Sequence, residues 1–248
     1  MREPESLEGG PKRPNPKPHT DLTLAMVLWN EAPRLPALIK MAHRWFGHVV
    51  MVVQDSSDDT LEIARKAERP GDRVIADAWH GTGDASMPKL LKHVDTDWVF
   101  VLAGDEMPSK ELLETLWTAG WWGEENGVDG LWIPFHSTID GIAYTEQHGH
   151  LRMFKTELGW PHTMHSRPTV NEEAWWPFGY VDHDRSLSEL VVDYLRYLSM
   201  SDGNSGWIAH NRLMLRSACE GVAEVKGWDY VHSHEWWPQV EAAVFTEE

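Results

Sequence analysis

The first half of the chain alternates short apolar runs with longer amphipathic stretches. Apolar runs of four to seven residues between turn-forming residues are typical of buried strands, which are predicted at residues 22–28, 49–53, 73–76 and 98–102. The amphipathic stretches predict helices at about residues 33–45, 61–67, 85–93 and 109–116. This succession of strands and helices predicts an α/β fold with a mainly parallel central sheet and helices on both faces.

The fourth predicted strand ends in an acidic turn. Ala103 and Gly104 are small enough to let the backbone approach a ligand, and Asp105 and Glu106 follow them. Ser109 is expected to cap the next helix. Two acids before a helix also complement its dipole without any ligand. A buried strand aims its end rigidly, however, and ligands of open α/β sheets bind at the carboxyl ends of strands, so this turn is the first candidate site.

A second polar turn follows the second predicted strand. Asp58 or Asp59 is expected to bond the first amides of the next helix. Asp55 comes directly beyond the strand and has no such structural role. A carboxylate in this place can accept hydrogen bonds from a ribose or a base edge, so Asp55 is a second candidate for ligand binding.

The second half of the chain has fewer clear elements. Ser186 and Glu189 fit a capping box, and the apolar residues of the following helix recur at helical spacing up to Leu198. That face is expected to pack on the domain. Another helix is predicted at residues 207–219, ended by Gly221.

Composition narrows the class of protein. The chain has 248 residues, is 42% hydrophobic and carries a formal charge of -17, which disfavours a protein that binds by neutralising many phosphates. Cys219 is the only cysteine, so no intrachain disulfide can form and a cytoplasmic location is the default. No stretch approaches the roughly 18 apolar residues of a membrane span. No GxGxxG or P-loop motif is present to grip phosphates.

The ends of the chain are expected to be less ordered than its middle. Residues 1–20 lack an apolar period and predict a disordered tail, which leaves residues 21–248 as one domain. The 15 tryptophans are many for this length, and adjacent pairs such as Trp236-Trp237 cannot all point inward. Exposed indole rings stack on sugar faces and on nucleobases, so the composition is compatible with either ligand.

An ordered set of motifs resembles the family-2 glycosyltransferases of GT-A fold. The first three are Trp29-Asn30-Glu31, Asp55-Ser-Ser-Asp58-Asp-Thr60, and Asp97-Trp-Val-Phe-Val-Leu-Ala-Gly-Asp105-Glu106. The resemblance is greatest to the lipopolysaccharide-core branch, which carries NE, DxSxDxT and DADE in those places. The later RLF…W…VHE segment of that branch resembles His150-Leu-Arg152-Met-Phe154 with Trp160 and Met164-His165. Its H…K…RY segment resembles Asp182-His183 with the helix at 190–200. The likeness covers about residues 22–200.

This resemblance implies transfer of a sugar from a nucleotide-sugar donor to an acceptor hydroxyl. The donor half would be residues 21–106 and the acceptor half about 107–200, followed by a helical part at 201–248. The residues implied to bind the nucleotide-sugar are Asn30, Glu31, Asp55, Asp84, Lys89, Gly104, Asp105 and Glu106.

The resemblance also implies a divalent cation, Mn²⁺ or Mg²⁺, on the donor diphosphate. Asp105 corresponds to the metal-binding aspartate of the family, and the counterpart of His165 suggests an imidazole that completes the coordination. A cation there stabilises the negative charge that develops as the nucleoside diphosphate leaves. Ala103 stands where the family has the first acid of its motif, and Ser166 stands where it has a glutamate on the acceptor side.

An inverting transfer needs a general base within reach of the acceptor hydroxyl. Besides Asp105, the catalytic candidates are Asp182 and Asp184, which flank the histidine of the later family motif. Glu172 and Glu173 are further carboxylates in this half of the chain. The sequence leaves the choice between Asp182 and Asp184 open.

Three interpretations of the acceptor side follow. The family branch favours a saccharide, such as a lipopolysaccharide core. A hydroxymethylated base in viral-type DNA is an alternative, because exposed tryptophans can stack on an extruded base, although the net charge of -17 disfavours DNA. The losses at Ala103 and Ser166 also suit a nucleotide-sugar- or carbohydrate-binding module without turnover.

Overall fold

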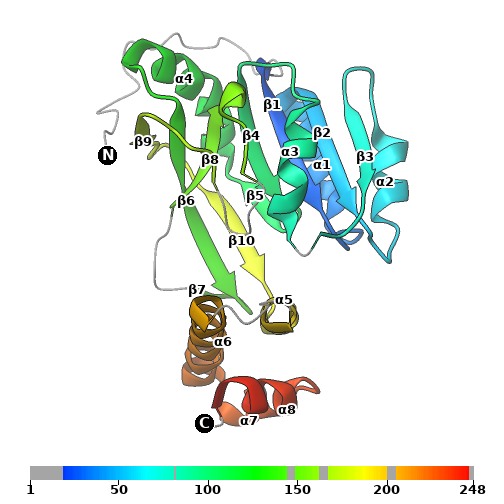
Figure 1. Ribbon diagram of the computed structural model, residues 1–248, viewed down its shortest axis with the longest axis vertical. Coiled ribbons are helices and arrows are strands. Elements are labelled where there is room, and N and C mark those ends of the chain that lie inside the picture. The colour runs from blue at the N-terminus through cyan, green and yellow to red at the C-terminus, as the bar shows by residue number, and fades with distance from the viewer. Residues whose placement is uncertain (1–18, 81, 144–148, 162–166, 200–204, 246–248) are drawn as a thin grey trace. The chain divides into compact units, whose positions relative to one another are not determined.

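The computed structural model describes residues 19–80, 82–143, 149–161, 167–199 and 205–245 (Figure 1). The chain divides into two compact units, where the sequence analysis expects one domain. The first comprises Met1–Phe135 with His148–Asp182, and the second His136–Gln147 with His183–Glu248. Each unit is described by itself.

Four parallel strands form the centre of the first unit. In spatial order they are β3 (Arg73–Asp77), β2 (Phe46–Gln54), β1 (His19–Leu28) and β4 (Trp98–Ala103). Leu24 of β1 pairs with Val49 on one side and with Phe100 on the other, so β1 lies between β2 and β4. The predicted parallel strands are confirmed, although β1 and β2 each begin three residues earlier than expected.

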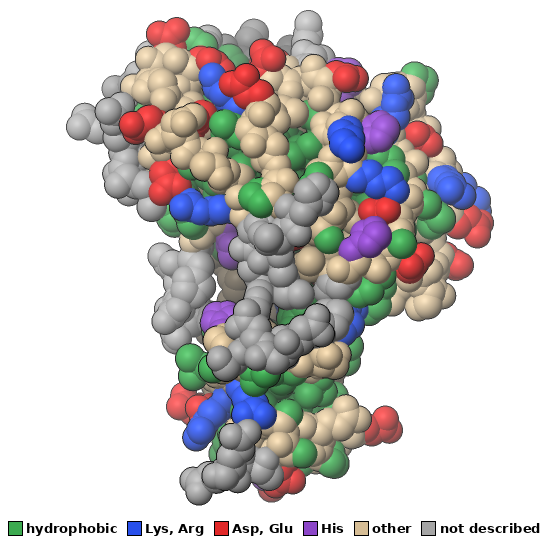
Figure 2. Space-filling model, viewed as in Figure 1, with side chains coloured by type: hydrophobic (Ala, Val, Ile, Leu, Met, Phe, Trp, Pro, Cys, Tyr) green, Lys and Arg blue, Asp and Glu red, His purple; other side chains and the backbone are tan. Residues whose placement is uncertain are grey.

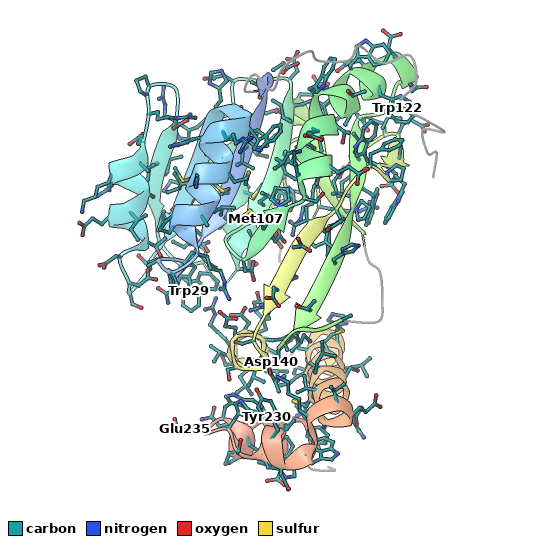
Figure 3. All side chains as sticks on the ribbon, turned by 180° about the vertical axis from the view of Figure 1, so that it is seen from behind. Trp29, Met107, Trp122, Asp140, Tyr230 and Glu235 are labelled. Carbon is teal, nitrogen blue, oxygen red and sulfur yellow. The ribbon has the colours of Figure 1, made fainter. Side chains whose placement is uncertain are left out.

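Helices cover both faces of this sheet, as predicted. Leu24 and Met26 of β1 lie in one apolar cluster with residues of α1 (Leu35–Trp45) and α4 (Lys110–Asn126). Ala25, which points to the opposite face, lies in a second cluster with α3 (Met87–Leu91). Figure 1 shows α3 in front of the sheet, and Figure 3, drawn from behind, shows α1 in front of it. The core therefore has two layers, one on each side of the sheet.

Two helices of the first unit differ from their predicted bounds. The stretch at 85–93 begins as a 3₁₀ turn, η1 (Gly83–Ser86), and becomes helical only at α3, where a proline suits the first turn. Helix α4 is capped by Ser109, as predicted, but continues to Asn126 and ends at Gly127. A side chain at Gly123 would meet the ring of Trp98 at 2.8 Å, so this helical glycine permits close packing on β4 rather than ending the helix.

Beyond β4 the sheet continues with strands that the sequence analysis does not predict. β8 (Gly149–Lys155) is antiparallel to β4 and to β6 (Gly130–Ile139), and β9 (Glu173–Trp175) is parallel to β6. β5 (Glu106–Pro108) neighbours β10 (Val181–Arg185). A short 3₁₀ turn, η2 (Thr156–Leu158), follows β8. The mainly parallel prediction therefore holds for the half of the sheet that precedes Asp105.

Asp129 fixes the turn that leads into β6. The residue is only 9% exposed, and its carboxylate accepts hydrogen bonds from the backbone amides of Asn171 and Glu172 and from the side-chain amide of Asn171. Burial alone would raise the pKa of Asp129, but these hydrogen bonds outweigh burial and lower it below its usual value. The ionised carboxylate therefore stabilises the folded chain.

We expect Asp129→Asn to destabilise the protein more at neutral pH than in acid. The pKa of the folded chain lies below the unfolded value of about 3.9, so the contribution is complete above that pH and is lost as the pH falls through the folded pKa. Urea unfolding at pH 7 should show a loss of about 1–3 kcal/mol, and the gap to wild type should narrow toward pH 3. A gap that does not depend on pH would contradict this assignment.

The second unit is mainly helical. Its elements are α5 (Leu187–Ser199), α6 (Ser205–Lys226), α7 (Trp228–His232), α8 (Trp237–Val240) and a π turn, η3 (Glu241–Phe245). The capping box of α5 is confirmed, because Glu189 accepts from the amide of Ser186 and donates its own amide to the Ser186 hydroxyl. The predicted end at Gly221 is wrong, since α6 continues to Lys226. In the ranges given above, no helix is long and apolar enough to cross a bilayer.

Asp140 connects several elements of the second unit. Asp140 and Gly141 have positive φ angles of 52° and 75° and join β6 to β7 (Ile142–Ala143), as in a two-residue type I′ hairpin. The carboxylate of Asp140 accepts from the amide of Leu187 and from the hydroxyl of Tyr230 (Figure 3). The predicted apolar face of α5 packs in the cluster around α6 of this unit.

Candidate active site at the carboxyl edge of the sheet

The loops that follow β1, β2 and β4 leave the same edge of the sheet. Asp55 is the first residue after β2, and Asp105 is the second residue after β4. Near this edge Leu28 of β1 pairs with Val53, and Val27 pairs with Ala103. Because β1 lies between the two other strands, about 10 Å separates β2 from β4 across the sheet. The two predicted carboxylates thus lie on one edge, on either side of β1.

Asn30 ties the loop after β1 to the loop after β2. It has a positive φ angle of 55°, which asparagine tolerates better than most residues. Its side-chain oxygen accepts from the amide of Ser57 at 2.8 Å, and its own amide donates to the Ser56 hydroxyl at 3.0 Å. The structure therefore gives Asn30 an architectural role, and its predicted contact with the nucleotide stays a prediction.

Asp58 lies two residues before the start of α2 (Thr60–Ala67), and its side chain bonds both to α2 and to the loop after β1. One carboxylate oxygen accepts from the amide of Thr60 and the other from the amide of Ala32, both at 3.0 Å. Burial would raise the pKa of Asp58, but the hydrogen bonds from Thr60 and Ala32 lower it. The predicted helix capping is confirmed for Asp58, whereas the side chain of Asp59 forms no capping bond.

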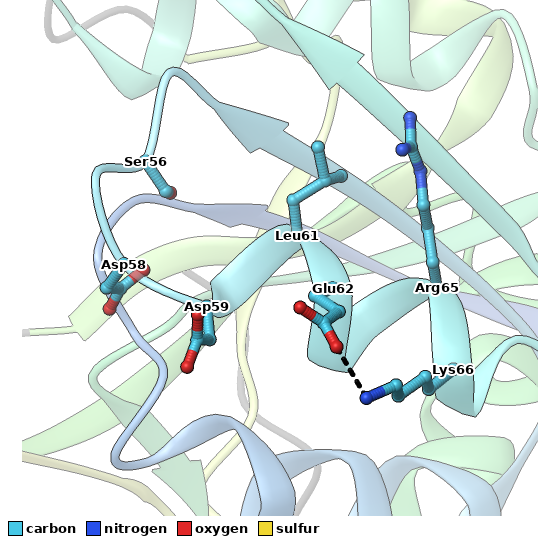
Figure 4. A pocket seen from close by; sticks show the side chains of 7 residues that line it. All are labelled: Ser56, Asp58, Asp59, Leu61, Glu62, Arg65 and Lys66. Atoms are coloured by element: carbon cyan, nitrogen blue, oxygen red, sulfur yellow. Dashed lines mark hydrogen bonds and ion pairs between the residues drawn. The ribbon is translucent and has the colours of Figure 1, made fainter.

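An open hollow of about 510 Å³ lies along α2 (Figure 4). Ser56, Asp58 and Asp59 line the part of it near the loop, and Glu62 and Lys66 form an ion pair at 2.5 Å farther along the helix. Ser56 and Asp58 are bonded to the loop after β1. The hollow is therefore bounded by groups that hold the two loops together.

Gly104 is a point of close approach between the loops after β1 and β4. A Cβ atom at Gly104 would lie 2.2 Å from Cγ of Glu31. The amide of Glu31 donates to the Thr60 hydroxyl at 2.8 Å, which ties the same loop to α2. The absence of a side chain at Gly104 makes room for the Glu31 side chain, and the predicted approach of a ligand to Gly104 stays a prediction.

Glu106 is buried, although the sequence analysis places it in the nucleotide site. It is 3% exposed, and its Oε2 accepts from the amide of Ala103 at 2.8 Å. Its Oε1 accepts from the guanidinium of Arg152 on β8. Asp105, between two buried residues, is half-buried. Of the two acids in the turn, Asp105 is therefore the better placed to meet a ligand.

Asp84 and Lys89 lie near the β3 end of the edge. The ammonium of Lys89 pairs with Asp77 at 2.6 Å, and the Ser86 hydroxyl donates to the same carboxylate at 2.7 Å. Burial would raise the pKa of Asp77, but these bonds lower it. Asp84 belongs to η1, where its amide donates to the Thr82 hydroxyl. Lys89 would have to leave Asp77 to reach a phosphate.

Two tryptophans beside Asp55 form part of the edge that the sequence analysis does not identify as a site. The rings of Trp29 and Trp79 are 5.7 Å apart between centroids. The backbone amide of Trp79 donates to the Asp55 carboxylate at 2.9 Å, which is a structural role that the sequence did not suggest. Flat rings beside an exposed carboxylate suit a base and its ribose. The sequence did offer one indication of a role for Trp29, because this residue directly precedes the family motif residues Asn30 and Glu31.

The candidate bases lie on β10. Asp182 belongs to the first unit, on the strand that neighbours β5, and β5 directly follows Asp105. Asp184 belongs to the second unit and accepts from the Thr138 hydroxyl. The geometry therefore places Asp182 in the same unit as Asp105.

A preformed metal cage is not found in the described part of the chain, where no three His, Cys, Asp or Glu side chains gather. The predicted ligand His165 lies outside the described residues. Cations such as Mg²⁺ are usually held by one or two carboxylates together with substrate phosphates and water, rather than by an all-protein cage. Asp105 therefore fits a cation that arrives with a diphosphate.

We expect Gly104→Ala to displace the acidic turn, because the new Cβ atom and Glu31 cannot both keep their places. Urea unfolding should show a loss of about 1–3 kcal/mol. Gly221→Ala is the control, since nothing lies within 4 Å of its added Cβ, and it should be neutral or stabilising. Equal stability of Gly104→Ala and wild type would show that the turn and Glu31 are not tightly packed.

Residues 23–184 match the family described as Glycosyl transferase family 2. An uncharacterized glycosyltransferase of Rickettsia felis is 33% identical over 92 residues, which are 37% of this chain and 31% of that protein. The crystal structure of S. aureus TarS 1-349 in complex with UDP has a TM-score of 0.50 and 16% identity, covering 90% of this chain and 79% of that one. This chain thus spans about a third of the Rickettsia relative, and the likeness to TarS is one of fold.

Proposed function

Because the chain belongs to glycosyl transferase family 2, we propose that it moves a sugar from a nucleoside-diphosphate donor to an acceptor hydroxyl. The fold is the GT-A fold of such enzymes. One observation carries the proposal: Asp55 and Asp105 leave the same edge of the parallel sheet on either side of β1. That arrangement offers one carboxylate to the nucleoside and another to the diphosphate.

The β2 and β3 side of the edge is proposed to hold the nucleoside. Asp55 can accept hydrogen bonds from ribose hydroxyls, and the rings of Trp29 and Trp79 offer faces for the base. Asn30 and Glu31 shape this side through their bonds to Ser57 and Thr60. The donor would then extend over the end of β1 toward Asp105.

Asp105 is proposed to face the diphosphate and to hold a divalent cation, Mn²⁺ or Mg²⁺, together with its oxygens. When bound, the cation stabilises the negative charge of the leaving nucleoside diphosphate. Ala103 supplies no carboxylate and Glu106 is bonded to Arg152, so the chain offers chiefly Asp105 here, and His165 is the further proposed ligand. Cation binding should accordingly depend strongly on the nucleotide.

Asp182 is proposed as the general base, with Asp184 as the alternative. In an inverting transfer the acceptor oxygen forms a bond to the anomeric carbon while the bond to the diphosphate oxygen breaks. The hydroxyl proton passes to the carboxylate of the base. Both carboxylates are exposed, but Asp182 shares the first unit with Asp105, whereas Asp184 belongs to the second unit and accepts from the Thr138 hydroxyl. These differences favour Asp182.

A saccharide is the proposed acceptor, of the lipopolysaccharide-core kind that the family branch suggests. On the face shown in Figure 2, basic side chains are scattered among acidic and apolar ones. Together with the formal charge of -17, this disfavours the alternative of a hydroxymethylated base in DNA. A binding module without turnover is the second candidate function, favoured by the absence of a carboxylate at Ala103 and by the bonds of Glu106 to Ala103 and Arg152.

Calorimetric titration of UDP, GDP, CDP and dTDP, with Mn²⁺ or with EDTA, tests the donor site. UDP comes first because it is the nucleotide in the TarS complex. We expect binding that Mn²⁺ strengthens. Asp105→Asn should abolish the effect of Mn²⁺, and Asp55→Asn should weaken binding about tenfold both with Mn²⁺ and with EDTA.

Asp59→Asn is the matched control, because Asp59 is exposed and forms no capping bond, and it should bind as wild type does. If none of the nucleotides binds, the proposed function is wrong. Binding that is followed by neither donor hydrolysis nor transfer to any saccharide or to hydroxymethylcytosine-containing DNA would favour the binding module instead.

A further inference from the structure

Arg152 reaches the acidic turn from the strand next to β4. It lies on β8, whose Met153 pairs with Phe100 of β4 in the antiparallel register. Its guanidinium donates to Glu106 and lies 5.2 Å from the ring centroid of Phe135. The side chains of Arg152 and Glu106 are 19% and 3% exposed, so the ion pair is largely removed from water.

A buried ion pair is a poor source of fold stability. Desolvation of the two charges offsets most of their attraction, and apolar residues of similar volume in their place are often neutral or stabilising. What this pair does supply is direction, because a charge-assisted hydrogen bond from one guanidinium nitrogen to Oε1 holds the Glu106 carboxylate in one orientation and leaves Oε2 for the Ala103 amide. We therefore ask which other residues of the turn are positioned by the fixed orientation of Glu106.

Glu106 constrains the position of Asp105 through the backbone of the turn. Its second oxygen accepts from the amide of Ala103, the last residue of β4, and so closes the turn on itself. Only Gly104 and Asp105 lie inside the closed turn. Gly104 is packed against Glu31, so the backbone around Asp105 is held on both sides.

We propose that Arg152 is a positioning residue for sugar transfer, which orients Asp105 through Glu106 without touching the donor. The inference rests on the proposed function and makes a narrower claim. Loss of Arg152 should weaken only the binding that passes through Asp105, which is that of the diphosphate with its cation. The nucleoside end at Asp55 lies across β1 and should be unaffected.

Calorimetry with UDP and with UMP, in Mn²⁺ or in EDTA, separates these contributions. For Arg152→Met we expect the affinity for UDP in Mn²⁺ to fall about 10- to 100-fold, as is usual when a group that supports a metal ligand is lost. The affinities for UMP and for UDP in EDTA should stay within about twofold of wild type, because neither depends on Asp105 and a cation.

Two further variants test the same ion pair between Arg152 and Glu106. Arg152→Lys keeps the charge but replaces the planar guanidinium by a shorter, more flexible ammonium, and should lie between Arg152→Met and wild type. Glu106→Gln keeps an oxygen for the Ala103 amide but loses the ion pair, so it should reproduce the loss. The double variant Glu106→Gln with Arg152→Met should lose no more than either single one, because the two residues act as a unit.

Arg69→Met is a matched control in the same unit. Arg69 pairs with the buried Asp72 and donates to the carbonyl oxygens of His43 and Phe46, just before β2 and at its first residue. It thus belongs to the amino-terminal edge of the parallel strands, opposite the proposed site. This variant should lower Tm and leave the affinity for UDP in Mn²⁺ unchanged.

Each other outcome overturns the inference. Unchanged affinity of Arg152→Met for UDP in Mn²⁺ would make Arg152 structural only. An equal loss in Mn²⁺ and in EDTA would show a direct contact between Arg152 and phosphate. If Arg152→Met does not fold, Arg152→Lys and Glu106→Gln decide by the same comparison. Failure of wild type to bind UDP or any other nucleotide would instead remove the proposed function itself, which is a distinct result.

Discussion

The parallel pairing of β1 with both β2 and β4 is the constraint on which the site depends. It brings three strand ends to one edge of the sheet. Asp55 and Asp105, which are 50 positions apart in the sequence, therefore follow strands that are separated only by β1. The apolar side chains on both faces of these strands, packed under α1 and α4 on one side and α3 on the other, make that edge rigid. The packing of the core therefore determines where the residues of the proposed site lie.

Most polar residues of the edge hold the loops to one another. Asn30 and Asp58 join the loops after β1 and β2, Glu31 fills the space beside Gly104, and Glu106 closes the acidic turn under Arg152. The motif residues therefore divide into many that build the edge and few that are proposed to meet a ligand. This division explains why a chain with a carboxylate missing at Ala103 still presents Asp105 from a well-defined turn.

The sequence predicted the parallel half of the fold well, because strands buried on both faces appear as continuous apolar runs. β6 and β8 escaped prediction because one side of each is partly exposed, and residues such as Pro134 and His150 interrupt their apolar pattern. The burial of Glu106 was also invisible, since its partner Arg152 is 46 positions away and only the β4–β8 pairing brings them together. Likewise, Gly104 showed its size in the sequence but not its neighbour Glu31.

The central claim is that a nucleoside diphosphate lies across the end of β1, between Asp55 and Asp105. A crystal structure of the protein with UDP and Mn²⁺ tests it most directly. We expect the ribose at Asp55, the diphosphate and cation at Asp105, and Glu106 still paired with Arg152. A nucleotide bound away from this edge, or a diphosphate that does not approach Asp105, would contradict it.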